Sequence, residues 1–88
     1  MHDEENYRYI GKNVIDLTVK ENKILSLLIQ RKGKIVTHKE LTILLYGIFD
    51  HYSKLCMMNK MCKLRKKLKG EVEIITRNYI GYTIRQVN

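Results

Sequence analysis

The chain has 88 residues, of which 44% are hydrophobic and 30% are charged, and its formal net charge is +8. A chain of this length forms at most one domain with a small core, and its composition is typical of a globular protein rather than a disordered one. Its apolar stretches are too short to cross a bilayer, and its start, MHDEEN, is acidic where a signal peptide would be basic and then apolar. We therefore expect a cytoplasmic protein that makes no membrane contact.

The cysteines and the other reactive residues indicate neither a metal site nor an enzyme. Cys56 and Cys62 fall in one predicted helix, where their backbones would lie about 9 Å apart along the axis, beyond the limit of about 7 Å for a disulfide. Their spacing with His51 is too wide for a metal site, so two reduced thiols in a reducing compartment are favoured. We find no paired carboxylates, no nucleophile–histidine spacing and no phosphate-binding glycine loop. We expect no enzymatic activity and no cofactor.

The first predicted elements are a tail and a hairpin. Residues 1–6 are expected to form a frayed acidic tail, and residues 7–88 are expected to form the domain. Two β-prone runs, Tyr7–Ile10 and Val14–Leu17, are separated by the turn-like spacer Gly11–Asn13. This arrangement predicts a short antiparallel hairpin.

Two capping-box sequences open the first two predicted helices. In each, a threonine is followed three residues later by a glutamate, so that each side chain can bond the other residue's backbone N–H. Glycines and basic residues mark the ends of the helices. The predicted elements are a helix from Thr18 to about Gly33, a strand at Ile35–Val36, and a helix from Thr37 to Gly47.

A third helix and a second hairpin complete the chain. The helix is predicted to run from a Ser53 cap to about Lys69, after a connector at Gly47–Ser53. Two β-rich runs, Val72–Thr76 and Ile80–Val87, then predict the hairpin. The order predicts an α+β fold of the winged helix-turn-helix type, with three helices, a short N-terminal β-hairpin and a C-terminal β-hairpin wing.

Positive charge is concentrated in the third predicted helix. From Lys54 to Lys69 there are seven basic residues and no acid, which accounts for +7 of the total +8. A solvated helix face usually carries Glu–Lys pairs at i,i+4, and a membrane-surface helix carries a broad bulky apolar face. This helix has neither feature. The charge therefore favours a polyanionic partner such as nucleic acid.

At 100° per residue, the third helix divides into separate faces. One stripe is predicted to face the core and holds Met57, Met61, Leu64 and Leu68. A second stripe, with Asn59 on its flank, holds Cys56, Lys60, Lys63 and Lys67. We predict that this stripe binds phosphates, that Asn59 and Lys63 read base edges beside the small Cys56, and that Lys67 contacts a phosphate.

Four motifs in this order and spacing resemble the OmpR/PhoB-type effector domain, the DNA-binding half of many bacterial two-component response regulators. They are LTVKE (Leu17–Glu21), GKIVTHKEL (Gly33–Leu41), LRKKL (Leu64–Leu68) and IITRNYIGY (Ile74–Tyr82). The resemblance covers residues 14–87. It implies sequence-specific binding of double-stranded DNA for transcription regulation, with the third helix in the major groove and the wing near the minor groove. No receiver domain is present, so either an excised effector domain or a free-standing regulator is expected.

The resemblance also implies individual contacts. On the third helix the family's DNA-contacting positions fall on Cys56, Asn59, Lys60 and Lys63, with Arg65 at a phosphate. The wing contacts that it implies are Arg77, Asn78 and Tyr79. In the family, however, an arginine followed by a glycine typically stands one place later in the chain than Arg77. Either Arg77 serves as the minor-groove cation, or Asn78 takes the turn position with positive φ and thereby shifts Arg77.

Protein partners are implied by the same resemblance. The connector corresponds to the loop through which some members touch RNA polymerase, with Phe49 and Tyr52 as candidates. The alternative for both side chains is that they fold onto the core. Relatives often bind direct repeats as tandem pairs, which points to a tandem dimer on DNA. The alternative function is a winged-helix interaction module that contacts RNA polymerase or another regulator.

Overall fold

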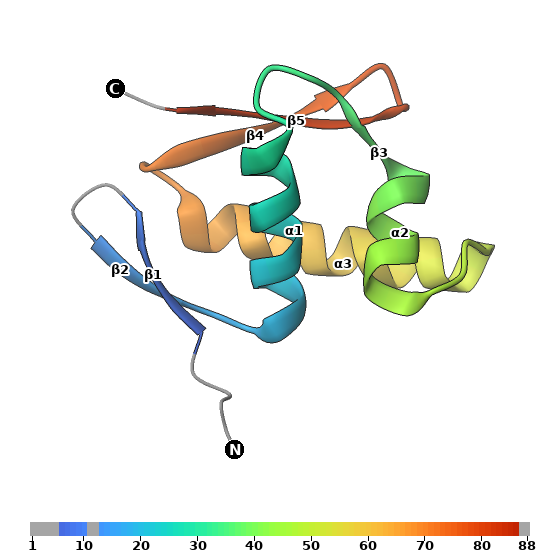
Figure 1. Ribbon diagram of the computed structural model, residues 1–88, viewed down its shortest axis with the longest axis horizontal. Coiled ribbons are helices and arrows are strands. Elements are labelled where there is room, and N and C mark those ends of the chain that lie inside the picture. The colour runs from blue at the N-terminus through green and yellow to red at the C-terminus, as the bar shows by residue number, and fades with distance from the viewer. Residues whose placement is uncertain (1–5, 11–12, 87–88) are drawn as a thin grey trace.

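The described residues fold into three helices and two antiparallel sheets (Figure 1). The structure, a computed structural model, describes residues 6–10 and 13–86, with side chains from 14 to 85. The elements are β1 (Asn6–Ile10), β2 (Asn13–Leu17), α1 (Val19–Gln30), β3 (Val36–Thr37), α2 (His38–Tyr46), α3 (His51–Leu68), β4 (Val72–Arg77) and β5 (Gly81–Gln86). The predicted tail lies outside the described residues except for Asn6, which begins β1, and so do Gly11 and Lys12 of the predicted spacer.

Both predicted capping boxes are present. The backbone N–H of Glu21 donates to Thr18 Oγ1 at 3.2 Å, and the backbone N–H of Thr18 donates to Glu21 Oε1 at 2.9 Å. Thr37 and Glu40 make the same reciprocal pair at the start of α2. These bonds satisfy backbone donors that a helix start leaves without intrahelical partners. The boxes therefore fix where α1 and α2 begin.

Two predicted boundaries are wrong. The N-cap of α3 is Asp50 rather than Ser53, because Asp50 Oδ1 accepts the Ser53 backbone N–H at 2.7 Å and the helix begins at His51. Asp and Ser are equally good caps, so local chemistry alone does not separate the two positions. The short strand is Val36–Thr37 rather than Ile35–Val36, because Val36 and Thr37 are the residues that pair with β5.

The three-stranded sheet has the order β3–β5–β4 and is antiparallel throughout. Gly81 lies opposite Thr37 on one side and Arg77 on the other. A Cβ atom on Gly81 would stand 2.0 Å from the carbonyl oxygen of Val36, so only glycine allows β3 to approach β5 this closely. The glycine is required here for contact between backbones rather than for a positive φ.

The core lies where the helices meet the sheets. In Figure 1, α1 runs from the β1–β2 hairpin toward the three-stranded sheet, and α3 crosses behind it. The predicted core stripe of α3 is confirmed, because all four of its residues are at most 1% exposed. Other core side chains come from each remaining described element between β2 and β5: Leu17, Ile24, Leu25, Leu28, Val36, Leu41, Leu45, Ile74, Tyr82 and Ile84.

Candidate nucleic-acid interface

The side of α3 opposite its buried stripe is a continuous exposed strip, which we call the outer face. It spans about 80° of the helix circumference at 100° per residue. Its residues, all exposed, are Tyr52, Leu55, Asn59, Lys63 and Lys66. The predicted stripe lies to one side of this strip, and two of its members, Cys56 and Lys60, are half-buried. Asn59 and Lys63 are therefore brought together on the outer face, whereas Cys56 and Lys60 lie at its edge.

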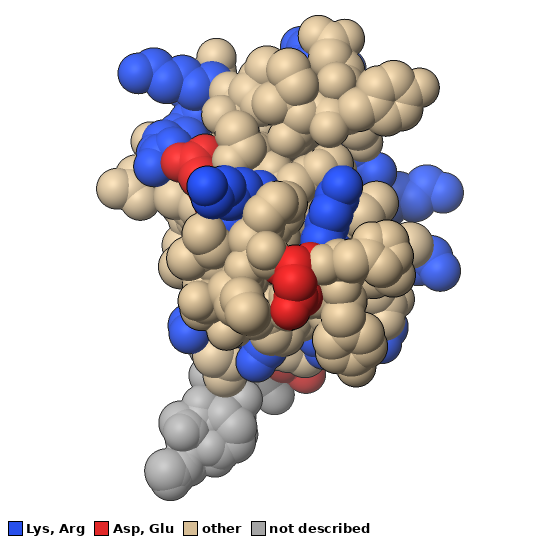
Figure 2. Space-filling model, turned by 90° about the vertical axis from the view of Figure 1, so that its right-hand side faces the viewer, with Lys and Arg blue, Asp and Glu red and all other residues tan. Residues whose placement is uncertain are grey.

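The outer face carries charge of one sign. Between His51 and Leu68, α3 contains no acidic residue. In the described part of the chain, no carboxylate lies within ion-pair distance of Lys60, Lys63 or Lys66. Figure 2 views the end of the molecule where the wing turn and the α2–α3 connector project, and acidic atoms occupy only a few small areas there. The lysines of this face are available to an external anion.

Lys67 differs from these lysines because it is paired with a carboxylate of the same chain. Its Nζ lies 2.7 Å from Glu21 Oε1 and 3.1 Å from the backbone oxygen of Asp16. The carboxylate belongs to α1, 46 residues away along the chain, so inspection of α3 alone could not find it. Lys67 ties the end of α3 to α1 and β2, and its contact with a phosphate stays a prediction.

The carboxylate that holds Lys67 is itself buried. Glu21 is 1% exposed. Burial works against the charged form, but the bonds from Lys67 and the Thr18 backbone N–H outweigh it and keep the pKa of Glu21 below its usual range. Glu21 is therefore ionised at neutral pH, and it both caps α1 and anchors α3.

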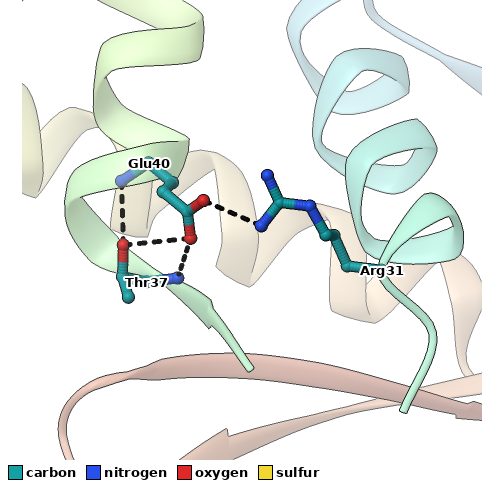
Figure 3. A network of polar contacts seen from close by, with 3 residues as sticks. All are labelled: Arg31, Thr37 and Glu40. Atoms are coloured by element: carbon teal, nitrogen blue, oxygen red, sulfur yellow. Dashed lines mark hydrogen bonds and ion pairs between the residues drawn. The ribbon is translucent and has the colours of Figure 1, made fainter. Parts of the chain in front are cut away.

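A second ion pair holds α2, the helix before α3, against α1. Arg31 follows α1, and its Nη1 lies 2.8 Å from Glu40 Oε2 (Figure 3). The other oxygen of Glu40 accepts from the Thr37 backbone N–H at 3.1 Å. These two bonds lower the pKa of Glu40, the backbone bond contributing most. One carboxylate thus caps α2 and fixes its position relative to α1, which orients the α2–α3 unit.

Arg65 connects α3 to the wing. Its Nη2 donates to Thr76 Oγ1 at 2.7 Å, and its guanidinium lies 5.3 Å from the ring centroid of Tyr82. Thr76 is on β4 and Tyr82 on β5, so one side chain spans both wing strands. A cation over an aromatic face is attractive, and the contact sets the wing's position relative to α3. The phosphate contact implied for Arg65 stays a prediction.

The wing turn uses two residues in the left-handed region. Asn78 has φ 48° and Tyr79 has φ 60°, and the Ile80 backbone N–H closes the turn onto the Arg77 oxygen at 2.8 Å. Asn78 thus has the positive φ that the second interpretation requires, and the role of Arg77 as the minor-groove cation stays a prediction. Arg77, Asn78 and Tyr79 are all exposed, and Tyr79 is 93% exposed. Their contact with DNA stays a prediction.

Replacing Tyr79 with glycine should raise the free energy of unfolding by about 0.5–1 kcal/mol. The side chain buries almost nothing, and a left-handed φ costs a residue with a Cβ about 1–2 kcal/mol, partly offset by the greater unfolded-state entropy of glycine. Urea unfolding measures the change. Arg77→Gly, in an extended strand, is the matched control and should destabilise the domain. A loss of stability in both variants would contradict the left-handed assignment.

The connector residues are also exposed. Phe49 is 42% exposed and Tyr52 is 76% exposed, so neither side chain is folded onto the core as the alternative required. Leu55, which is absent from the residues predicted above, lies on the outer face four residues before Asn59. Helical spacing from Asn59 was the signal that could have found it.

The described residues contain neither a metal-binding cluster nor a membrane-spanning helix. No group of three or more His, Cys, Asp or Glu side chains there could hold a metal ion. Among the helices described, none combines the length and the apolar character that crossing a bilayer requires.

Comparisons with known proteins agree with this geometry. Residues 11–84 match the family described as "Transcriptional regulatory protein, C terminal". No curated protein matches the chain. Among similar solved structures, the DNA-binding domain of the response regulator AdeR, in complex with an intercistronic region, is 23% identical with a TM-score of 0.74, and 99% of each chain is covered. The DNA-binding domain of Bacillus subtilis CssR is 24% identical with a TM-score of 0.71, and the match covers 90% of this chain and 99% of that one. The C-terminal domain of the nisin resistance regulator NsrR is 24% identical with a TM-score of 0.72, and the match covers 100% of this chain and 98% of that one. At these identities the likeness establishes the winged-helix fold.

Proposed function

The chain belongs to the family of transcriptional regulatory protein C-terminal domains, and on this premise we propose that it binds double-stranded DNA sequence-specifically through the outer face of α3. In this proposal α3 enters the major groove and the wing lies near the adjacent minor groove. The domain acts in the cytoplasm as the effector part of a transcriptional regulator.

The observation that carries the proposal is the composition of the outer face. Lys63 and Lys66 project from it as exposed cations, with Lys60 at its edge, and no acid interrupts them. Each phosphate that such a lysine neutralises releases counterions, which gives affinity without sequence information. Asn59, about one turn before Lys63 on the same strip, is exposed and presents an amide that can bond adenine through its carbonyl and its NH2 group. One face therefore supplies both the cations that would position the protein on DNA phosphates and the amide that would recognise a base.

The wing supplies a second point of contact in the proposal. Arg77 and Asn78 are exposed at the turn, where a cation and an amide suit the narrow, electronegative minor groove of A·T-rich DNA. Arg65 supports this arrangement because it joins α3 to both wing strands. A wing held at a fixed position allows two adjacent grooves to be contacted together.

Substituting Lys63 with alanine tests the proposal. If Lys63 contacts a phosphate, the slope of log K against log salt should fall in magnitude by about 0.9. If it also contacts a base, a preferred site should weaken more than random duplex. Binding isotherms between about 50 and 200 mM salt measure both quantities.

The matched control is Lys23→Ala, which removes an exposed lysine from α1, where it lines the same surface hollow as Leu44 of α2. This variant should keep the slope of the unmodified chain. Equal slopes for all three proteins would contradict the assignment of Lys63.

A second candidate function is contact with RNA polymerase or another regulator, and the exposed connector favours it. Ile48 of the connector is exposed as well as Phe49 and Tyr52. Exposed aromatic side chains are typical anchors of protein interfaces. Duplex binding that hardly responds to ionic strength would favour this function over DNA recognition. Tandem pairing on direct repeats is compatible with both functions.

A further inference from the structure

We propose that Leu55 reads the methyl group of a thymine in the major groove, one or two base pairs from the pair that Asn59 contacts. The inference rests on the proposed function and makes it more specific, because it names the kind of base pair at one position. It assigns a role in specificity to an apolar side chain, which carries no charge and makes no hydrogen bond.

The burial of Leu55 sets it apart from the other leucines of α3. Leu64 and Leu68 are fully buried, whereas Leu55 is 50% exposed. At 100° per residue, Leu55 lies about 40° from Asn59 and at the opposite side of the helix from the core stripe. It therefore belongs to the outer face, and it does not help to close the core.

Among the base edges in the major groove, thymine alone presents a methyl group, and apolar side chains recognise thymine by contact with it. An isobutyl side chain that projects from the outer face can cover this methyl group and exclude water from it. The neighbouring amide of Asn59 suits adenine. Together the two side chains favour A·T pairs over G·C pairs in the part of the site that they contact.

The spacing of the two side chains limits where the thymine lies. Four residues along a helix correspond to a rise of about 6 Å, and successive base pairs are about 3.4 Å apart. When α3 lies along the groove, Leu55 and Asn59 thus contact pairs that are one or two steps apart. The methyl-bearing thymine is expected at that distance from the adenine.

An exposed leucine alone would carry no such inference, because single apolar residues are common on protein surfaces. The position is what distinguishes Leu55. It lies on a strip with Asn59 and Lys63, in a helix without acids. A protein partner seated on Leu55 and Tyr52 is the competing explanation, and the experiment separates the two.

The experiment uses the whole chain and begins with selection of preferred duplexes from a random pool at near-physiological salt. Each thymine of the selected site is then replaced, one at a time, with deoxyuridine, which lacks only the methyl group. Loss of one buried methyl contact should lower the affinity roughly threefold to fivefold at one position. In Leu55→Ala the same replacement should have no effect, because the contact is already absent.

The matched control is Leu44→Ala, which shortens another exposed leucine, on α2. This variant should keep the full response to deoxyuridine. A selected site that responds nowhere to deoxyuridine, or a response that persists in Leu55→Ala, would overturn the inference and leave the proposed function standing. Failure to select any preferred duplex would overturn both. A defect of Leu55→Ala that is equal for thymine and deoxyuridine sites would place the contact of Leu55 somewhere other than a thymine methyl group, and would also overturn the inference. An affinity of Leu55→Ala equal to that of the unmodified chain on both kinds of site would leave the side chain to a protein partner.

Discussion

Replacing Gly81 with alanine is expected to lower the free energy of unfolding by about 3 kcal/mol or more, and to leave little folded protein. The new Cβ would stand 2.0 Å from the Val36 oxygen and 2.7 Å from the Thr37 Cα, and both are backbone atoms that no rotamer change can move. Relief requires β3 to separate from β5, and β3 leads directly into the N-cap of α2. The disturbance would therefore reach the α2–α3 unit.

Urea unfolding measures this effect, and Gly33→Ala is the control. Gly33 has φ 87°, and a Cβ atom there would have nothing within 4 Å, so alanine meets backbone strain but no clash. We expect the control to cost about 1–2 kcal/mol. Equal losses in the two variants would show that the close approach of β3 to β5 is not what requires Gly81.

The second large effect is expected at Glu21. Glu21→Ala should destabilise the domain by about 2–4 kcal/mol, because it removes one of the two bonds of the α1 capping box and leaves Lys67 without its carboxylate. Lys67 keeps partial contact with solvent, which moderates the loss. Val19→Ala, at an exposed position in the same helix turn, is the control and should change stability little. A small effect in Glu21→Ala would show that the ion pair does not anchor α3.

The same pair makes a prediction about pH. The pKa of Glu21 is lowered in the folded chain, so the carboxylate stabilises the fold above its unfolded pKa, near 4.3, and this contribution is lost as pH falls through the folded pKa. Glu40 and Asp50, whose pKa values are also lowered, contribute to the same acid loss. The difference between the unmodified chain and Glu21→Gln isolates Glu21. This difference should shrink below about pH 4, and a constant difference would contradict it.

Local rules were enough to predict much of the fold. The capping boxes depend on two residues three positions apart, and the core stripe of α3 depends on helical periodicity, so both can be found without tertiary contacts. The contact of Gly81 with Val36 joins residues 45 positions apart, and it could not be inferred from either segment alone. The choice between Asp50 and Ser53 failed for another reason, because both residues are good caps.

The candidate site, too, could be predicted from local sequence only in part. Periodicity identified Asn59 and Lys63, which the structure leaves exposed. It placed the centre of the basic stripe too far round the helix, where Cys56 and Lys60 are half-buried and Lys67 meets a carboxylate of α1. Burial and that ion pair are tertiary properties, which the periodicity of one helix does not contain. The structure places Asn59 at the centre of the outer face and Leu55 at one edge of it.

The most direct test is to titrate the isotope-labelled chain with a selected duplex and to follow every backbone amide by nuclear magnetic resonance. The amide signals that shift most should belong to Leu55, Asn59 and Lys63 on α3 and to Asn78 and Tyr79 at the wing turn. Those of Lys23 and Leu44, on α1 and α2, should stay in place. Shifts concentrated on α1 and α2, with α3 unaffected, would contradict DNA binding by the outer face.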